Sequence, residues 1–261
     1  MRPSPTRRGR LWRTKSGCKE NRHTHSTRDN WRKEPVRLMS TLSCLALVAS
    51  VALATTSGEL ETVLKQMDDS AAKFRTTEAS FTWTQYNKVI DDVTETQEGK
   101  IYFRRAGDET QMAAEIMQPS MKLVIFSDGK IQIYQPRLDQ VDIYDAGAHR
   151  EEFESFLVLG FGGSGKDMLR SFDVKYEGTE KIDGIETAKL DLTPKSEKVR
   201  QHFDHILLWI DPQKGLSLQQ KLFETSGDYR LAKYSGIQLN QKISEDKFKL
   251  KISGKTKTLT H

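Results

Sequence analysis

Apolar and polar residues alternate along most of the chain, which is the pattern of β-strands with one buried face. In residues 99–105, for example, Ile101 and Phe103 share one face. Two alternating runs flank Asp128-Gly129, a pair typical of two-residue hairpin turns. The pattern predicts strands at 79–86, 99–105, 121–126, 130–134, 140–144, 172–178, 185–192, 203–210, 216–224, 229–239 and 246–252.

Two stretches have helical spacing instead. Residues 149–171 read as two short helices joined by a glycine-rich loop. In residues 58–74, apolar residues recur every three or four positions, which predicts one amphipathic helix. These apolar residues are Leu60, Val63, Leu64, Met67, Ala71 and Phe74.

The predicted strands follow one another at intervals of about 8–12 residues, which is typical of an antiparallel barrel or sandwich. No linker or repeat divides residues 55–261, so we expect one mainly β (α+β) domain there. Its sheet would carry one early helix and one helical insert.

The first 54 residues differ from the rest. They hold 12 of the 41 basic residues and three of the 36 acidic ones, so the remainder is slightly acidic and a nucleic-acid partner loses its support. Residues 1–38 lack apolar periodicity, which predicts an unstructured leader. A true translation start near Val36 or Met39 would explain it. Residues 39–54 form an apolar run that ends in Ala-Leu-Ala, as in a signal peptide cleaved on secretion. A retained anchor is the alternative.

One short pattern suggests a nucleotide site. Gly160, Gly165 and Lys166 match the phosphate-binding G-x-x-x-x-G-K loop. However, Asp167 stands where that loop needs a hydroxyl for Mg²⁺, and an antiparallel meander is the wrong setting for it. We therefore interpret the stretch as a flexible connector between two lid helices.

Other chemistry is sparse. His202 and His205 would point to opposite faces of a strand, and no third ligand for zinc stands nearby. Cys18 and Cys44 both precede the expected cleavage site, which leaves no thiol nucleophile after it. The sequence also lacks a G-x-S-x-G element. We expect no enzyme activity, no metal and no cofactor.

The alternation predicts a curved sheet whose concave face is apolar. Helices laid over that face would leave a hydrocarbon-lined cavity, and such cavities bind apolar ligands. The alternative is a dry core filled by its own side chains. The expected lining residues are Phe81, Trp83, Ile101, Phe103, Leu123, Ile125, Ile131, Ile133, Val141, Ile143, Leu208 and Ile210, with Leu64, Met67, Phe74, Phe153 and Phe156 covering them.

Arg105 continues the face of Ile101 and Phe103, so its guanidinium is expected at the rim of the cavity. Unpaired burial of this charge would be costly. A hydrogen bond to a carbonyl or carboxylate of the lid would remove that cost, and ligand entry would break it. The alternative is a side chain bent into solvent.

The order of several segments resembles the periplasmic outer-membrane lipoprotein carrier family, LolA. "EASFTWTQYNKV", "EGKIYFRR" and "LVIFSDGKIQIYQPRLDQVDIY" match its early strands. "LDLTPK", "LLWIDPQKGL" and "GIQLNQKISEDKFKLKI" resemble its closing strands, and together these segments span most of residues 59–253. Ala106 replaces the proline that the family has after its strand arginine, and the turn that follows also differs.

This resemblance implies an incomplete antiparallel β-barrel with a helical lid, held closed by Arg105. It implies a monomeric periplasmic carrier that binds the acyl chains of lipoproteins. The implied partners are acylated lipoproteins, an inner-membrane ABC exporter that delivers them and an outer-membrane acceptor. Cargo of another lipid class, or a structural or protein-interaction module without ligand, are the alternatives.

Overall fold

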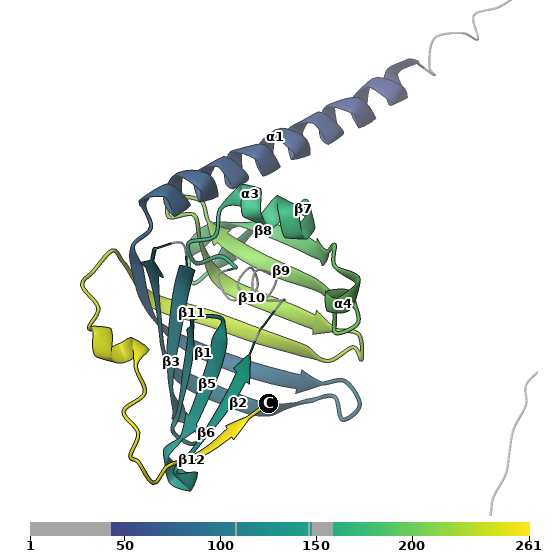
Figure 1. Ribbon diagram of the computed structural model, residues 1–261. Helices are drawn as coiled ribbons and strands as arrows, with labels where there is room; N and C mark the ends of the chain where they lie inside the picture. Colours follow the sequence, from purple (N-terminus) through teal and green to yellow (C-terminus); the bar gives the residue numbers. More distant parts are fainter. Residues whose placement is uncertain (1–42, 108, 146, 148–158) are drawn as a thin grey trace, which may run out of the picture. The chain divides into compact units, whose positions relative to one another are not determined.

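The computed structural model describes residues 43–107, 109–145, 147 and 159–261. Within this part of the chain, twelve strands form one strongly curved sheet in the order β12-β6-β5-β4-β3-β2-β1-β11-β10-β9-β8-β7 (Figure 1). The strands are β1 (Thr76–Asn87), β2 (Asp92–Ala106), β3 (Glu109–Gln118), β4 (Lys122–Ser127), β5 (Lys130–Gln135), β6 (Gln140–Asp145), β7 (Phe172–Ile182), β8 (Ile185–Pro194), β9 (Phe203–Asp211), β10 (Leu216–Glu224), β11 (Tyr229–Leu239) and β12 (Lys257–Thr260).

Neighbouring strands in this order pair antiparallel, with one exception, because β12 pairs parallel to β6. The curved, open antiparallel sheet that we expected is confirmed. β3 was not among the predicted strands, and β2 begins well before residue 99. Register shifts in β1, β7 and β10 add residues to one strand of a pair, and such bulges bend a sheet and increase its twist.

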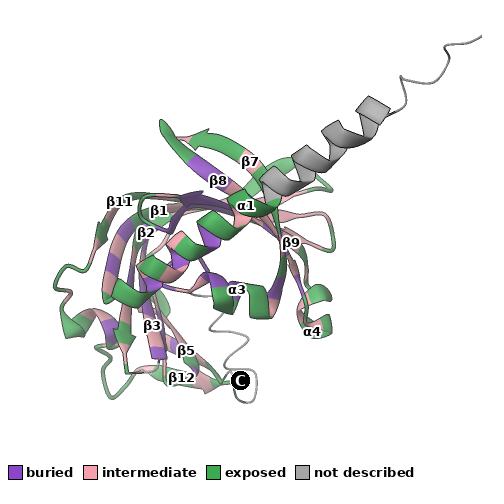
Figure 2. Ribbon diagram, turned by 90° about the horizontal axis from the view of Figure 1, so that it is seen from above, coloured by how far each residue is buried: buried purple, intermediate pink, exposed green. Residues whose placement is uncertain are grey.

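Two helices pack on the concave face of the sheet (Figure 2). α1 (Ser43–Lys73) and α3 (Gly165–Ser171) bring Leu64, Met67 and Met168 against the buried side chains of β8 and β9. This cluster, here the α1 cluster, contains Val63, Leu64, Met67, Leu159, Met168, Phe172, Ala188, Leu190, Leu192, Ile206, Leu208 and Ile210. The amphipathic face expected at 58–74 is confirmed, although the helix begins at Ser43. The remaining short helices are η1 (Pro136–Leu138), α4 (Glu197–Arg200) and η3 (Glu245–Phe248).

The end of α1 is tied to the end of β11. The Asn240 side-chain amide donates to the Lys73 carbonyl at 3.1 Å, which satisfies a free carbonyl of the last helical turn. Its side-chain oxygen accepts the Arg75 backbone N–H at 2.8 Å. Ser70 also donates to the carbonyl of Lys214 in the β9–β10 turn at 2.6 Å. These bonds hold the helix across the sheet.

The chain after β11 returns along the convex face. A strand was expected at 246–252, but the structure has the 3-10 helix η3 followed by irregular chain, so this prediction is wrong. Phe248 packs there against Tyr102, Ala113 and Ile125, which form the outer cluster. This segment buries the large side chain of Phe248 and does not present alternate residues to the core, so it does not pair with the sheet as a strand.

Residues 1–38 of the expected leader lie outside the described residues, as do residues 39–42 of the expected signal peptide. Residues 43–54 belong to α1. Within the part of the chain that the structure describes, no helix combines the length and apolarity that a membrane span requires.

Candidate functional site

The middle of the concave face is filled by an apolar group that we call the central cluster. It contains Phe74, Phe103, Met112, Ala114, Phe126, Phe161 and Leu216, each at most 8% exposed. Phe81, Ile101, Val124, Ile131, Tyr234, Ile237 and Leu239 pack around it. The cluster joins strands β1 to β5 with β10 and β11, so it lies where the sheet curls around on itself.

Phe161 is the member of the central cluster that comes from the loop before α3, whereas Phe74 follows the end of α1 and the other members lie on strands. It lies in the loop 159–164 that precedes α3, and it is 1% exposed. Its ring stacks on Phe103, with centroids 5.0 Å apart, and meets Tyr234 edge-on at 4.6 Å. The loop therefore inserts an aromatic side chain into the space where a ligand cavity was expected. The sequence offered one signal for it, an aromatic residue between glycines.

The loop is attached to β10 on one side. Gln220 donates to the Leu159 carbonyl at 2.5 Å, and the backbone N–H of Ser217 donates to the Gly160 carbonyl at 2.9 Å. Gly160 has a φ of +77°, and a Cβ there would lie 2.4 Å from the Cβ of Ser217. Glycine is thus required by close packing, and the interpretation of this stretch as a loose connector is wrong.

Arg105 contacts the same loop from the other side. Its guanidinium donates to the Gly162 carbonyl at 3.3 Å and lies 5.8 Å from the centre of the Phe74 ring. The side chain is nevertheless exposed, so water still reaches the charge. Both expected features therefore occur together: the guanidinium reaches a carbonyl of the loop, and it remains partly in solvent.

Many of the expected lining residues do lie on the concave face. Phe81, Ile101, Phe103, Phe74 and Ile131 belong to the central cluster or pack on it, and Leu64, Met67, Leu208 and Ile210 belong to the α1 cluster. Trp83 continues the face of Phe81, and Ile133 pairs with Val124. Phe153 and Phe156 lie outside the described residues.

Beyond Trp83 the concave face becomes polar. The Arg230 guanidinium lies 5.9 Å from the centre of the Trp83 ring, and its Nε lies 2.7 Å from the Glu224 carboxylate. The apolar part of the face therefore ends near Trp83.

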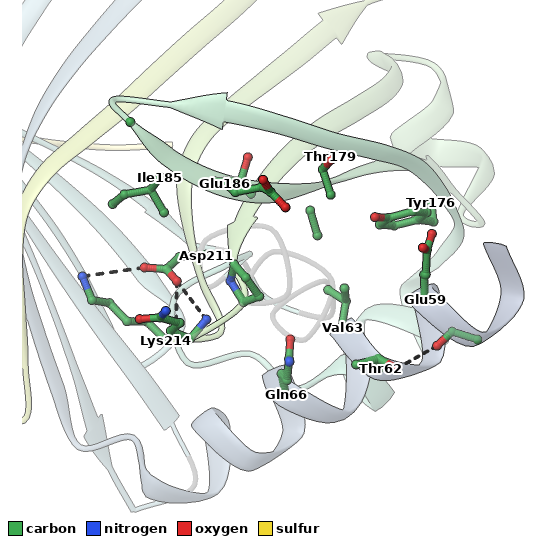
Figure 3. Close-up of a pocket in the computed structure, with 16 residues that line it drawn as sticks. Glu59, Thr62, Val63, Gln66, Tyr176, Thr179, Ile185, Glu186, Asp211 and Lys214 are labelled. Carbon is green, nitrogen blue, oxygen red and sulfur yellow. Dashed lines mark hydrogen bonds and ion pairs between the residues drawn. The ribbon is translucent and has the colours of Figure 1, made fainter. Parts of the chain in front are cut away.

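A cleft of about 800 Å³ lies between α1 and the β7–β8 hairpin (Figure 3). Glu59, Val63 and Gln66 line it from α1, where their spacing of three and four residues places them on one side of the helix. Tyr176 and Glu186 line it from the hairpin. The sequence alone does not predict this cleft, because the two walls of the cleft are more than a hundred residues apart along the chain.

Four expected lining residues lie on the opposite, convex face. Leu123 pairs with Tyr134, Ile125 with Gln132, Tyr134 with Val141, and Gln132 with Ile143. Directly paired residues share a face, and Ile125 belongs to the outer cluster, so this group points away from the central cluster. The expectation that Leu123, Ile125, Val141 and Ile143 line the cavity is wrong.

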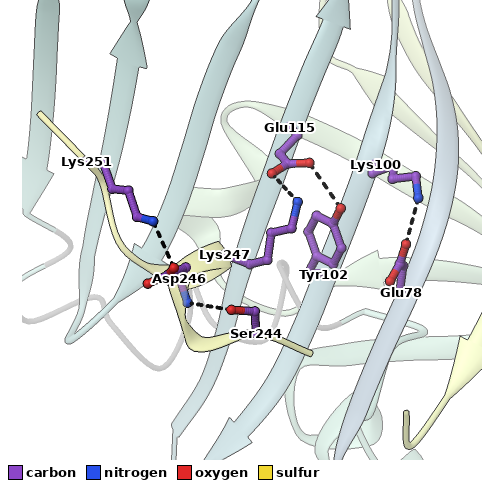
Figure 4. Close-up of polar contacts among 8 residues, drawn as sticks. All are labelled: Glu78, Lys100, Tyr102, Glu115, Ser244, Asp246, Lys247 and Lys251. Atoms are coloured by element: carbon purple, nitrogen blue, oxygen red, sulfur yellow. Dashed lines mark hydrogen bonds and ion pairs between the residues drawn. The ribbon is translucent and has the colours of Figure 1, made fainter. Parts of the chain in front are cut away.

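The convex face next to these residues is covered by the chain around η3 (Figure 4). The Lys247 ammonium lies 2.6 Å from the Glu115 carboxylate, which also accepts the Tyr102 hydroxyl at 3.1 Å. The hydrogen bond to Glu115 raises the pKa of Lys247, and burial raises the pKa of Tyr102. Asp246 and Lys251 form a further ion pair at 2.8 Å. Polar contacts thus fasten this segment outside the sheet.

The nucleotide and zinc patterns gain no support. The Lys166 backbone N–H at the start of α3 donates to the Asp68 carboxylate at 3.2 Å, so a negative group already occupies this position. His205 stacks on Phe223 and pairs with Asp204. Among the described residues, no group of three or more His, Cys, Asp or Glu side chains is arranged to hold a metal ion.

Comparison with known proteins identifies the architecture. The family model described as outer membrane lipoprotein carrier protein LolA matches residues 72–251. No curated protein sequence matches the chain. Similar solved structures include a LolA superfamily protein from Nitrosomonas europaea, at 12% identity and a TM-score of 0.37, over 73% of this chain and 97% of that one.

Two further structures are similar. Lipoprotein LppX from Mycobacterium tuberculosis is 12% identical, with a TM-score of 0.43, over 72% of this chain and 98% of that one. The MucA/MucB complex from Pseudomonas aeruginosa is matched at 15% identity and a TM-score of 0.45, over 74% of this chain and 61% of that one. Likeness at this level carries no conclusion about the function of this chain.

Proposed function

Because the chain belongs to the outer membrane lipoprotein carrier protein family, LolA, we propose that it carries the acyl chains of lipoproteins on the concave face of its sheet. The carrier works outside the inner membrane, after its leader has been removed. It accepts cargo from an inner-membrane ABC exporter and delivers it to an outer-membrane acceptor. It acts as a monomer and catalyses no reaction.

The observation that supports this proposal is the insertion of Phe161, from the loop 159–164, into the apolar concave face of the sheet. We infer that this is the closed state without cargo, in which the ring takes the place of hydrocarbon. Withdrawal of the loop would uncover Phe103, Phe126 and Ile131 for acyl chains. Each buried methylene then contributes about 0.8 kcal/mol, so one long chain outweighs the single ring that it displaces.

Arg105 would act as the latch of this loop. Its bond to the Gly162 carbonyl holds the closed state, and the approach of acyl chains under the loop breaks it. The freed guanidinium remains hydrated, because the side chain is exposed. Opening therefore leaves no buried unpaired charge, and the proposed switch is reversible.

The test has two parts. Lipids extracted from the purified protein are identified by mass spectrometry, and acylated cargo should copurify in stoichiometric amounts. The Arg105→Leu variant should then release a bound acyl probe at a rate that differs from wild type by about three- to tenfold, as expected from one lost hydrogen bond. Arg104→Leu is the matched control, because Arg104 points to the convex face and lies over the Phe248 ring at 4.3 Å.

The filled central cluster also favours a second candidate, a module that binds a protein partner and no lipid. The two candidates differ in the extraction experiment. Protein that is free of lipid in every preparation, and that takes up no acyl probe, would favour the module and remove the carrier function.

A further inference from the structure

The cleft between α1 and the β7–β8 hairpin presents hydrogen-bond acceptors to its interior. Glu59 and Gln66 extend into it from the helix, and Tyr176 and Glu186 extend from the hairpin (Figure 3). The Oε1 atom of Gln66 is buried and has no hydrogen-bond partner among the residues that the structure describes. Buried acceptors are normally satisfied, so this atom indicates a donor that the protein itself does not supply.

The charge of the cleft is negative. Lys214 lines it but lies 3.7 Å from the carboxylate of Asp211, so that pair is neutral. Within the described part of the chain, Glu59 and Glu186 form no ion pair. Burial raises the pKa of the Tyr176 hydroxyl, and the charges of Glu59 and Glu186 raise this pKa further. The negative potential of both carboxylates therefore reaches the same hydroxyl group.

The floor of the cleft is continuous with the apolar core. Val63 and Ala188 line the cleft and also belong to the α1 cluster, and Tyr176 packs against that cluster. Glu186 and Ala188 alternate with Thr187 on β8, so they face the same side of the sheet. The concave face therefore changes from apolar to acceptor-lined over two residues.

We propose that this cleft binds the ammonium group of an amphiphile whose hydrocarbon chain extends toward the α1 cluster. This inference rests on the proposed function, because it assigns the polar end of an acyl-bearing ligand to a place in the fold. The ammonium lies between the carboxylates of Glu59 and Glu186, and the Gln66 side chain rotates on binding so that its oxygen accepts from the ammonium. The cleft volume of about 800 Å³ accommodates such a group with several methylenes.

The experiment compares three probes of one chain length on the delipidated protein. Decylamine, decanol and decanoate are titrated below their micelle concentrations at pH 7 and low salt, with calorimetric detection. Decylamine should bind about three- to tenfold more tightly than decanol, as expected for two partly exposed ion pairs, and decanoate more weakly than both. The preference should shrink in 0.5 M salt, because screening is then strong.

The double variant Glu59→Gln/Glu186→Gln should bind decylamine and decanol with similar affinity. The control is Glu61→Gln/Glu177→Gln, which changes the charge equally on α1 and β7 at exposed positions outside the cleft lining. It should keep the preference for the amine. Thermal unfolding of both variants checks that the fold is intact.

The outcomes separate this inference from the proposed function. Equal binding of amine and alcohol by the wild type, or an unchanged preference in the Glu59→Gln/Glu186→Gln variant, overturns the ammonium site while the carrier function stands. Binding of none of the three probes overturns both. A preference that disappears equally in the control variant also overturns the site, because it would then reflect net charge alone.

Discussion

Replacing Phe161 with alanine should weaken the fold and strengthen ligand binding at the same time. The ring is 1% exposed and lies against Phe103 and Tyr234 with centroids 5.0 and 4.6 Å away. Truncation of such a phenylalanine costs about 3–5 kcal/mol of unfolding free energy. If the Phe161 ring must leave the central cluster before acyl chains enter, wild type loses the contacts of this ring when the loop opens. The alanine variant has no such contacts to lose, so opening of its loop costs less free energy by most of this amount. Since 1.4 kcal/mol corresponds to a factor of ten, affinity should rise at least tenfold.

The assay combines urea unfolding with titration of a fluorescent fatty acid. The matched control is Phe172→Ala, because Phe172 is 0% exposed in the α1 cluster and is held on β7 rather than on the loop. The control should lose comparable stability without a gain in affinity. An unchanged or weaker affinity of the Phe161→Ala variant would refute the idea that its ring competes with the ligand.

Two further predictions concern the loop and the ring beneath it. Gly162→Ala should lower the unfolding free energy by about 1–3 kcal/mol, because its φ is +84° and a Cβ would lie 2.6 Å from the Phe74 ring. Gly254→Ala is the control, because a Cβ there would have no atom of the described residues within 4 Å. A similar loss of unfolding free energy in both variants, measured by urea unfolding, would contradict this prediction. Burial raises the pKa of Tyr234, so the stability due to its neutral hydroxyl is complete below about pH 10 and is lost as the pH rises above this value. In urea unfolding at each pH, the unfolding free energy of Tyr234→Phe should fall less steeply between pH 9 and 11 than that of wild type, and an equal fall in both proteins would contradict this prediction.

Local periodicity was sufficient to place the first two strands. Phe81 and Trp83 alternate on β1, and Ile101 and Phe103 alternate on β2, so each pair had to share a face. The same reasoning placed Arg105 at the rim, because it follows in the same register. These positions depend on spacing within one strand, which a sequence shows directly.

The faces of the β4–β5 hairpin were assigned wrongly for a reason that the sequence contains. A two-residue turn at Asp128-Gly129 pairs Ser127 with Lys130. Odd-numbered residues before the turn are therefore paired with even-numbered residues after it, and paired residues lie on the same face of the sheet. Leu123 and Ile131 therefore had to lie on opposite faces. The prediction joined apolar residues of both strands without applying the register of its own turn.

Other features depend on distant parts of the chain and have no local signal. β12 forms because β6 offers an unpaired edge, with Leu259 opposite Asp142. Phe248 finds its place only after Tyr102 and Ile125 are arranged on the convex face. Such contacts decide the structure of a segment whose own pattern is ambiguous.

The glycines in and next to the loop 159–164 show how a glycine-rich composition can lead to a wrong prediction of flexibility. The glycine-rich composition at Gly160 and Gly165 predicts a flexible connector, yet a Cβ at Gly165 would lie 2.5 Å from the Leu64 carbonyl oxygen. Glycine is needed at these positions because the loop passes close to α1 and β10. Glycine also occurs in turns, where its small size and its tolerance of a positive φ are needed. A sequence does not show whether a given glycine serves a flexible turn or a closely packed loop.

The relative strength of the two loop contacts determines what controls opening. Arg105 offers one hydrogen bond of 3.3 Å to a neutral carbonyl and a cation–π contact of 5.8 Å, both at an exposed side chain. Such contacts stabilise by about 0.5–1.5 and 0.5–1 kcal/mol, respectively. The buried Phe161 ring stabilises the closed loop by more than both together. Loss of Arg105 should therefore change the rate of release, whereas loss of Phe161 should change the equilibrium between the closed and the ligand-bound states.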